Sequence, residues 1–244
     1  MSEHRDIRAV IFDIDGTLVD SFSAYWSVFN EGVRRFERKP VSKEALADCL
    51  KKGMGLAEII RRICLPPMKE EEVERCKKEI LDLFLTAEEE VVKPFPGVEM
   101  VFRSLKEKGL KIGIATGRMS LPEKEWERFG RFGLDKFIGA IVTSREVEGR
   151  KPAPDAIIEC ARRLGVPAGK CLVVGDTELD IVAARRAGAI PIAVTTGQEE
   201  EEVLAKAKPE SVCNNLNGLF LILGEKGSDE GRMERPTASN LEKR

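Results

Sequence analysis

The stretch RAVIFDIDGT at residues 8–17 decides how this chain is expected to fold. It begins with a short run of apolar residues, which is typical of a strand buried on both faces of a parallel sheet. The run ends in Asp13-Ile14-Asp15-Gly16-Thr17, so two carboxylates follow the carboxyl end of the strand. Ligands of parallel α/β sheets bind outside the carboxyl ends of the strands. The stretch therefore predicts the first strand of such a sheet and the place of its site.

Strands and helices are expected to alternate after the turn signal at residues 94–97, PFPG. Apolar runs predict further strands, and amphipathic periods predict helices between them. The expected strands are 111–115, 138–142, 171–174 and 190–194; the expected helices are 98–108, 121–132, 154–164 and 179–187, with a last helix or helix pair over 199–223. This alternation predicts the α/β class, with a Rossmann-like three-layer core of residues 1–20 and 93–223 built on a parallel sheet.

The residues between the first strand and the turn signal differ in character and predict an inserted all-helical domain, residues 21–92. Ser21 and Ser42 are expected to cap its first two helices, and two more helices are expected at 56–63 and from 69 to about 90. Residues 224–244 are polar and show no apolar period, so they are expected to form a disordered tail.

Composition argues against several classes of function. The net charge is −2, from 40 basic and 42 acidic residues, and no segment has the basic excess expected of a nucleic-acid-binding protein. The single histidine, His4, lies near the N-terminus, which argues against a zinc site built on histidine and against a Ser-His-Asp triad. The six cysteines are scattered, which favours free thiols in a reducing compartment. No segment looks like a signal peptide or a membrane span, so we expect a soluble, cytoplasmic protein without a membrane partner.

Further polar residues follow the other predicted strands or their loops: Thr116-Gly117-Arg118, Lys151, and Asp176 with Asp180. All of them are expected at the same edge of the sheet as Asp13 and Asp15. Clustered carboxylates repel one another unless a cation lies between them, and oxygen ligands favour Mg²⁺, which also accepts a phosphate oxygen. Each motif alone has a plainer interpretation, such as a turn, a surface lysine or a helix cap, but their joint occurrence predicts a magnesium and phosphate site.

These four motifs, in this order, resemble those of the haloacid dehalogenase-like superfamily, in particular its phosphatase branch with a helical cap inserted after the first strand. The resemblance covers roughly residues 7–223. It implies a nucleophile at Asp13, a general acid/base at Asp15, a phosphoryl ligand at Thr116 and a cation that holds the phosphoryl group at Lys151. It also implies a Mg²⁺ site formed by Asp13, the backbone carbonyl of Asp15, Asp176 and the supporting Asp180.

Three further residues are candidates for substrate binding: Gly117, Arg118 and Gly55. Gly55 belongs to the segment KKGMG, residues 51–55, which resembles the cap loop of phosphoglycolate phosphatase-like members. Its lysines suit an anionic leaving group, although lysines before a glycine are also an ordinary helix end. Arg118 is less typical of this branch, and it either contacts substrate or forms a surface ion pair.

The resemblance implies a Mg²⁺-dependent phosphatase that acts on a small phosphorylated metabolite and forms a phospho-aspartate, with phosphoglycolate as the expected substrate type. A phosphomutase of the β-phosphoglucomutase kind is the alternative, and a non-catalytic binding protein on the same fold ranks last because both Asp13 and Asp15 are present. The presence of Asp15 with the acidic pair argues against dehalogenation. The expected assembly is a monomer or homodimer.

Overall fold

The computed structural model describes residues 6–51 and 54–223 of the 244-residue chain. It divides into two compact units, which we call the core unit (Met1–Val19 with Pro94–Arg244) and the helical unit (Asp20–Lys93). The predicted disordered tail, residues 224–244, and the cap-loop residues Lys52 and Gly53 lie outside the described residues. Independent folding of the two units as domains stays a prediction.

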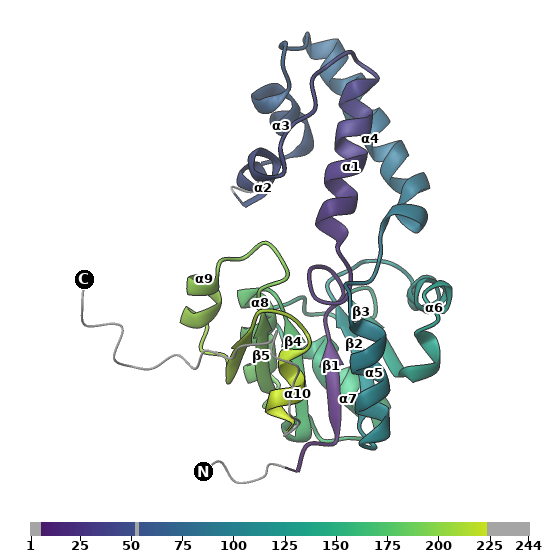
Figure 1. Ribbon diagram of the computed structural model, residues 1–244, viewed down its shortest axis with the longest axis vertical. Helices are drawn as coiled ribbons and strands as arrows, with labels where there is room; N and C mark the ends of the chain where they lie inside the picture. Colours follow the sequence, from purple (N-terminus) through teal and green to yellow (C-terminus); the bar gives the residue numbers. More distant parts are fainter. Residues whose placement is uncertain (1–5, 52–53, 224–244) are drawn as a thin grey trace, which may run out of the picture. The chain divides into compact units, whose positions relative to one another are not determined.

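A six-stranded sheet forms the centre of the core unit (Figure 1). Its strands are β1 (Ala9–Phe12), β2 (Lys111–Thr116), β3 (Ile138–Thr143), β4 (Cys171–Gly175), β5 (Ile190–Val194) and β6 (Ser211–Cys213). They lie in the order β3-β2-β1-β4-β5-β6, and every neighbouring pair is parallel. The first strand is central, so the residues that follow it lie in the middle of the carboxyl edge of the sheet.

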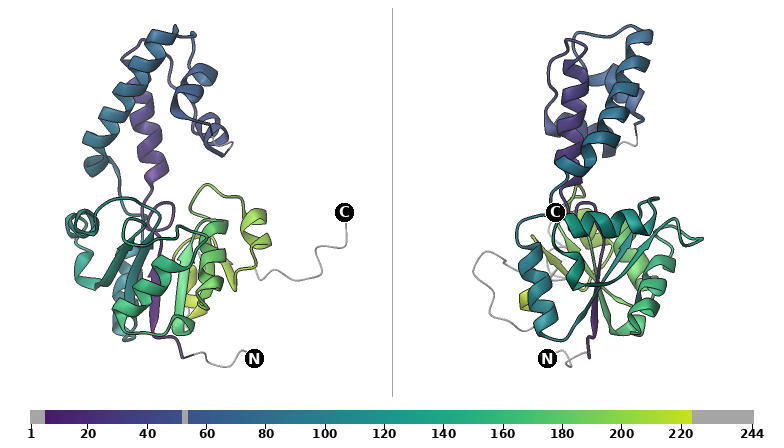
Figure 2. Two further views of the ribbon diagram at one scale, coloured as in Figure 1. Left: turned by 180° about the vertical axis from the view of Figure 1, so that it is seen from behind. Right: turned by 90° about the vertical axis from the view of Figure 1, so that its right-hand side faces the viewer.

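Helices cover both faces of this sheet, as Figure 2 shows. Those of the core unit are α5 (Val98–Glu107), α6 (Pro122–Arg131), α7 (Asp155–Leu164), α8 (Glu178–Arg186), α9 (Glu201–Lys206) and α10 (Gly218–Ile222), with short 3₁₀ turns at Asp135–Phe137 and Ala168–Lys170. α5 and α10 lie on one face, and α7 and α8 lie on the other. The predicted α/β class with a Rossmann-like parallel sheet is therefore confirmed.

Close packing fixes the helices against the strands. On one face the ring of Phe102 in α5 packs against that of Phe12, with centroids 5.3 Å apart. On the other face, a Cβ atom at Gly113 in β2 would lie 2.4 Å from Sγ of Cys160 in α7. Only a glycine at this position lets α7 approach the sheet so closely.

The last segment of the core unit departs from the prediction. A helix or helix pair was expected throughout residues 199–223, but β6 lies between the short helices α9 and α10 and pairs with β5. The prediction was wrong because a three-residue strand is too short to show any period. Its backbone forms a strand because the edge of β5 offers hydrogen bonds, so Thr195 N–H donates to the Cys213 carbonyl over 3.0 Å.

The helical unit contains α1 (Ser21–Arg34), α2 (Lys43–Lys51), α3 (Leu56–Ile63) and α4 (Glu70–Val91), and its described residues include no strand. Asp20, not the expected Ser21, caps α1, because its carboxylate accepts from Ser23 N–H over 2.9 Å. Ser42 caps α2 as predicted, and its hydroxyl accepts from Ala45 N–H over 3.2 Å.

A buried amide joins α1 to the segment that precedes α2. Asn30 is 5% exposed; its Nδ2 donates to the Val41 carbonyl over 3.1 Å and its Oδ1 accepts from Val41 N–H over 2.7 Å. Trp26 donates its indole N–H to the same carbonyl over 2.8 Å. These bonds satisfy backbone groups that would otherwise be buried without partners.

No helix within residues 6–51 and 54–223 combines the length and the apolar character that crossing a membrane requires.

Candidate active site

The carboxyl edge of the sheet gathers the predicted polar residues of the core unit. Asp13 directly follows β1, Thr116 is the last residue of β2, and Asp176 directly follows β4. Lys151 lies in the loop between β3 and α7. The Asp13 N–H donates to the Val174 carbonyl over 2.9 Å, so the backbone that carries Asp13 is held against β4.

Lys151 connects two of the carboxylates. Its Nζ lies 2.6 Å from Oδ1 of Asp13 and 2.6 Å from Oδ1 of Asp180, and all three side chains are nearly buried. Buried charges are stable only when they are paired and hydrogen-bonded, and here the ammonium donates to both partners. The pairing therefore fixes the position of the Lys151 ammonium next to the Asp13 carboxylate.

Asp180 has a second, structural role. It is the third residue of α8, and its Oδ2 accepts from the N–H and the hydroxyl of Thr177, over 3.1 and 2.6 Å. The Thr177 hydroxyl accepts in return from Asp180 N–H, which completes a capping box at the start of α8. Both oxygens of Asp180 therefore already accept hydrogen bonds from protein donors, and one of these donors is Lys151.

Asp176 is held by the residues packed around its carboxylate. The Thr17 hydroxyl donates to its Oδ1 over 2.8 Å. Cβ atoms at Gly16 and at Gly197 would lie 2.2 and 1.7 Å from its Oδ2, so neither position has room for a side chain. Gly16 also has a φ of +76°, which favours glycine. The two glycines thus let two loops close around one carboxylate.

Burial and crowding shift the pKa values of these groups. Burial is the largest effect on Asp13 and raises its pKa to about 7, against the opposing effect of Lys151. Burial and the charges of Asp13 and Asp180 raise the pKa of Asp176 to about 8. Burial alone would lower the pKa of Lys151, but Asp13 and Asp180 outweigh it and raise that pKa. The cluster therefore has more negative charge than its own ammonium neutralises.

The chemistry of this cluster fits a divalent cation. Carboxylate oxygens of Asp13, Asp176 and Asp180 lie within 4.8 Å of one another. Three carboxylates face one ammonium, and hard oxygen donors of this kind suit Mg²⁺. Asp15, the fourth predicted metal residue, is not in this group, because its side-chain oxygens lie against Arg118. The part expected of its backbone carbonyl stays a prediction.

The loop after β2 carries three of the predicted residues. Thr116 is 1% exposed, and its hydroxyl accepts from Arg118 N–H over 3.2 Å. A Cβ atom at Gly117 would meet nothing within 4 Å, so this part of the loop is open. Arg118 forms a two-point ion pair with Asp15, from Nε to Oδ2 over 2.7 Å and from Nη2 to Oδ1 over 2.6 Å. A substrate contact of Arg118 stays a prediction.

Gly55 lies in the helical unit, where it precedes α3 in an extended conformation. A Cβ atom at Gly55 would meet no other atom within 4 Å. Its predicted contact with substrate stays a prediction.

Three residues of this region had no functional role in the sequence interpretation: Thr17, Gly197 and Glu125. Thr17 belongs to the motif after β1, and its position there could have indicated a role in holding a carboxylate. Gly197 follows two threonines in an ordinary turn pattern. Glu125 is 0% exposed, yet it stands in a charged helical segment, which predicts a solvated face.

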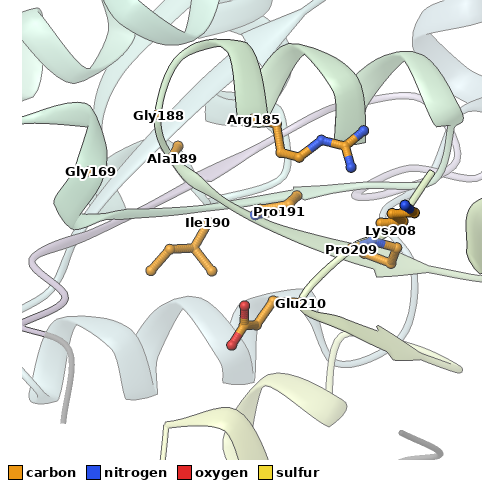
Figure 3. Close-up of a pocket in the computed structure, with 9 residues that line it drawn as sticks. All are labelled: Gly169, Arg185, Gly188, Ala189, Ile190, Pro191, Lys208, Pro209 and Glu210. Atoms are coloured by element: carbon orange, nitrogen blue, oxygen red, sulfur yellow. The ribbon is translucent and has the colours of Figure 1, made fainter. Parts of the chain in front are cut away.

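A pocket of about 400 Å³ lies elsewhere in the core unit (Figure 3). Its lining residues are Gly169, Arg185, Gly188, Ala189, Ile190, Pro191, Lys208, Pro209 and Glu210. Three of its segments precede or begin β4, β5 and β6. The pocket is therefore at the amino ends of these strands, opposite the edge that carries the carboxylates.

The fold and the site together define a class: an α/β protein with a lysine and several carboxylates at the carboxyl edge of a parallel sheet. The family of haloacid dehalogenase-like hydrolases matches residues 10–194. The chain belongs to this family.

Individual relatives agree with this assignment. A phosphoglycolate phosphatase of Pseudomonas fluorescens is 29% identical over 220 residues, which cover 87% of this chain and 78% of that protein. A phosphoglycolate phosphatase of Escherichia coli O157:H7 is 26% identical over 245 residues, covering 92% and 95%. The structure of a haloacid dehalogenase-like family hydrolase from Streptococcus pneumoniae superposes with a TM-score of 0.68 at 17% identity, covering 89% and 99%, which shows the shared fold. The family and these relatives make the chain a hydrolase of phosphoric monoesters.

Proposed function

We propose that this phosphatase is Mg²⁺-dependent and works through a phosphoryl group carried on Asp13. The observation that carries the proposal is the buried pair of Asp13 and Lys151, with Asp176 and Asp180 beside it. A carboxylate nucleophile divides hydrolysis into two displacements, and phosphoryl transfer depends chiefly on positioning and on neutralising the phosphoryl oxygens. The described residues around this pair include no histidine that could serve instead.

In the first displacement, a carboxylate oxygen of Asp13 attacks phosphorus and the bond from phosphorus to the leaving oxygen breaks. Lys151 donates to Asp13, and we assign to its ammonium the neutralisation of a phosphoryl oxygen. The Thr116 hydroxyl, at the end of β2, is proposed to bind another phosphoryl oxygen. Asp15 gives a proton to the leaving oxygen. A Mg²⁺ ion held by Asp13 and Asp176, supported by Asp180, would supply further charge stabilisation.

In the second displacement, water attacks phosphorus, the bond between phosphorus and the Asp13 oxygen breaks, and phosphate leaves. Asp15, ionised after the first displacement, takes the proton of the attacking water. Asp13 and Asp15 then return to their starting states, so atoms and protons balance over the cycle.

We further propose that the substrate is a small phosphomonoester of the phosphoglycolate type. The names of the Pseudomonas and Escherichia relatives support this choice. The helical unit, with Gly55 and the lysines at 51 and 52, is proposed to select the carboxylate of such a substrate.

The test is phosphate release from a panel of phosphorylated metabolites in MgCl₂, for the wild type, Asp13→Asn and the control Asp135→Asn. Asp135 is exposed and precedes β3, away from the carboxyl edge. We expect phosphoglycolate among the preferred substrates, a loss of at least about a thousandfold in Asp13→Asn, and no loss in the control. EDTA should abolish activity and Mg²⁺ should restore it. A well-folded Asp13→Asn protein that keeps substantial activity would refute the nucleophile. Conversion of a hexose phosphate without phosphate release would favour the mutase instead.

A further inference from the structure

The two-point ion pair between Arg118 and Asp15 is not explained by the four motifs. The guanidinium reaches both carboxylate oxygens, over 2.7 and 2.6 Å, so it fixes the plane of the carboxylate as well as its position. The Arg118 side chain is 14% exposed and that of Asp15 is 39% exposed. One side of Asp15 is therefore held by protein, while a large part of its surface remains open to solvent.

The Arg118 side chain is itself supported by a buried carboxylate. Glu125 in α6 is 0% exposed, and its Oε1 lies 3.7 Å from Nη1 of Arg118. The Ser120 hydroxyl donates to the same oxygen over 2.6 Å, and Arg128 Nε donates to Oε2 over 3.0 Å. A buried carboxylate is costly unless such partners compensate it. Glu125 thus gives the inner side of Arg118 a fixed negative partner.

The backbone of Arg118 is also fixed. Its N–H donates to the Thr116 hydroxyl over 3.2 Å, and its carbonyl accepts from Ser144 N–H over 3.0 Å. The Ser144 hydroxyl donates to the Thr116 carbonyl over 3.2 Å. The loop after β2 is therefore hydrogen-bonded to the end of β3. Both the backbone and the guanidinium of Arg118 are held by these contacts.

We infer that Arg118, anchored by Glu125, is a positioning residue that orients the ionised Asp15 carboxylate, so that it takes the proton of the attacking water in the second displacement. This inference rests on the proposed function, in which Asp15 serves as acid and base. Proton transfer is sensitive to geometry. Because the planar guanidinium binds both oxygens of Asp15, it fixes the orientation of the carboxylate relative to the group that exchanges the proton. A substrate ligand or a purely structural ion pair at Arg118 would predict different kinetics.

A double-mutant cycle that combines substitutions at Arg118 and Asp15 tests the inference. The substrate is p-nitrophenyl phosphate, because its leaving group departs without a proton and Asp15→Asn should therefore keep measurable activity. We expect Arg118→Met to lower kcat by about tenfold or more with little change in KM in the wild-type background, and by less than about twofold in the Asp15→Asn background. Arg118→Lys should recover only part of the loss, since an ammonium cannot form the fork. Glu125→Gln should lower kcat in the same Asp15-dependent way.

Three results would overturn the inference. Equal losses in both backgrounds would show that Arg118 acts independently of Asp15, and a rise in KM with kcat preserved would make it a substrate ligand. A fall in melting temperature with parallel losses on all substrates would make it structural. Failure of the proposed function is distinguishable, because it would appear as activity retained in Asp13→Asn, whatever the outcome of the cycle.

Discussion

At the scale of single residues, the packing around Asp176 makes Gly197 a sensitive position. A Cβ atom there would lie 1.7 Å from Oδ2 of Asp176, so Gly197→Ala must displace the carboxylate or the loop. We expect this variant to remain folded but to lose most of its thermal stabilisation by Mg²⁺, since that stabilisation depends on affinity for the folded state. Melting temperatures with and without MgCl₂ measure the effect.

The matched control for this variant is Gly130→Ala in α6, where the nearest atom to the new Cβ is 4.0 Å away. It should keep the full Mg²⁺ response. If Gly197→Ala responds to Mg²⁺ as strongly as the control does, Asp176 is not a ligand held by this contact.

The raised pKa of Asp176 predicts a pH dependence for the metal-free protein. Burial and the charges of Asp13 and Asp180 move this pKa from 3.8 to about 8. The protonated form therefore stabilises the fold fully below about pH 4, and this contribution is lost as pH rises through about 8. In EDTA, the melting temperature of the wild type should fall relative to Asp176→Asn between pH 5 and pH 9, because the amide cannot ionise.

Added Mg²⁺ should reverse this loss at pH 8 in the wild type and not in Asp176→Asn, because a bound cation favours the ionised carboxylate. A constant difference in melting temperature between the two proteins across this pH range, in EDTA, would contradict the assignment of the raised pKa.

At the scale of elements, the sequence predicted the strands well where an apolar run marked them. The apolar run before Asp13 and those at β2 to β5 gave the strands, because strands buried on both faces consist mainly of apolar residues. β6 was not predicted, because a strand of three residues shows no period and its conformation depends on pairing with β5. The cap of α1 was misplaced by one residue, since Asp20 and Ser21 are both good N-caps and only the backbone decides between them.

We expect the stability of the helical unit to depend on the buried side chain of Asn30. Asn30→Leu would remove both hydrogen bonds to Val41 and leave its backbone N–H buried without this partner. Such a loss costs about 1–3 kcal/mol for each unsatisfied group, so we expect a lower melting temperature and a lower denaturation midpoint. Ser27→Ala, at an exposed position of the same helix, is the control and should change stability by less than about 0.5 kcal/mol. Equal stability of the two variants would show that Asn30 is dispensable.

At the scale of the whole molecule, the sequence could indicate which polar residues meet but not what holds them. Asp13, Thr116 and Asp176 follow or end strands, and parallel strands end at one edge, so their meeting followed from topology alone. Glu125 could not be found in this way. A glutamate in a charged amphipathic helix predicts solvent exposure, and only the packing of α6 in the folded unit buries it. The supporting residues of a site depend on tertiary contacts that leave no local pattern.

The division into two units predicts that chemistry and selectivity can be separated. The chain leaves and re-enters the core unit at adjacent points, because Val19 and Pro94 form an antiparallel bridge and Phe95 N–H donates to the Leu18 carbonyl over 2.9 Å. A short Gly-Ser linker in place of residues 20–93 can therefore close the core unit at a small entropic cost. We expect this shortened protein to fold, with a cooperative thermal transition.

The shortened protein should still hydrolyse p-nitrophenyl phosphate in Mg²⁺, because every residue proposed for the chemistry belongs to the core unit. It should lose its preference for phosphoglycolate, because Gly55 and the lysines near it are absent. The measurement is the ratio of kcat/KM for the two substrates in the full and shortened proteins, with Asp13→Asn in the shortened protein as the control for contaminating activity. Retention of the full ratio would place substrate selection in the core unit. A folded but inactive core would mean that the helical unit supplies a group that the chemistry itself requires.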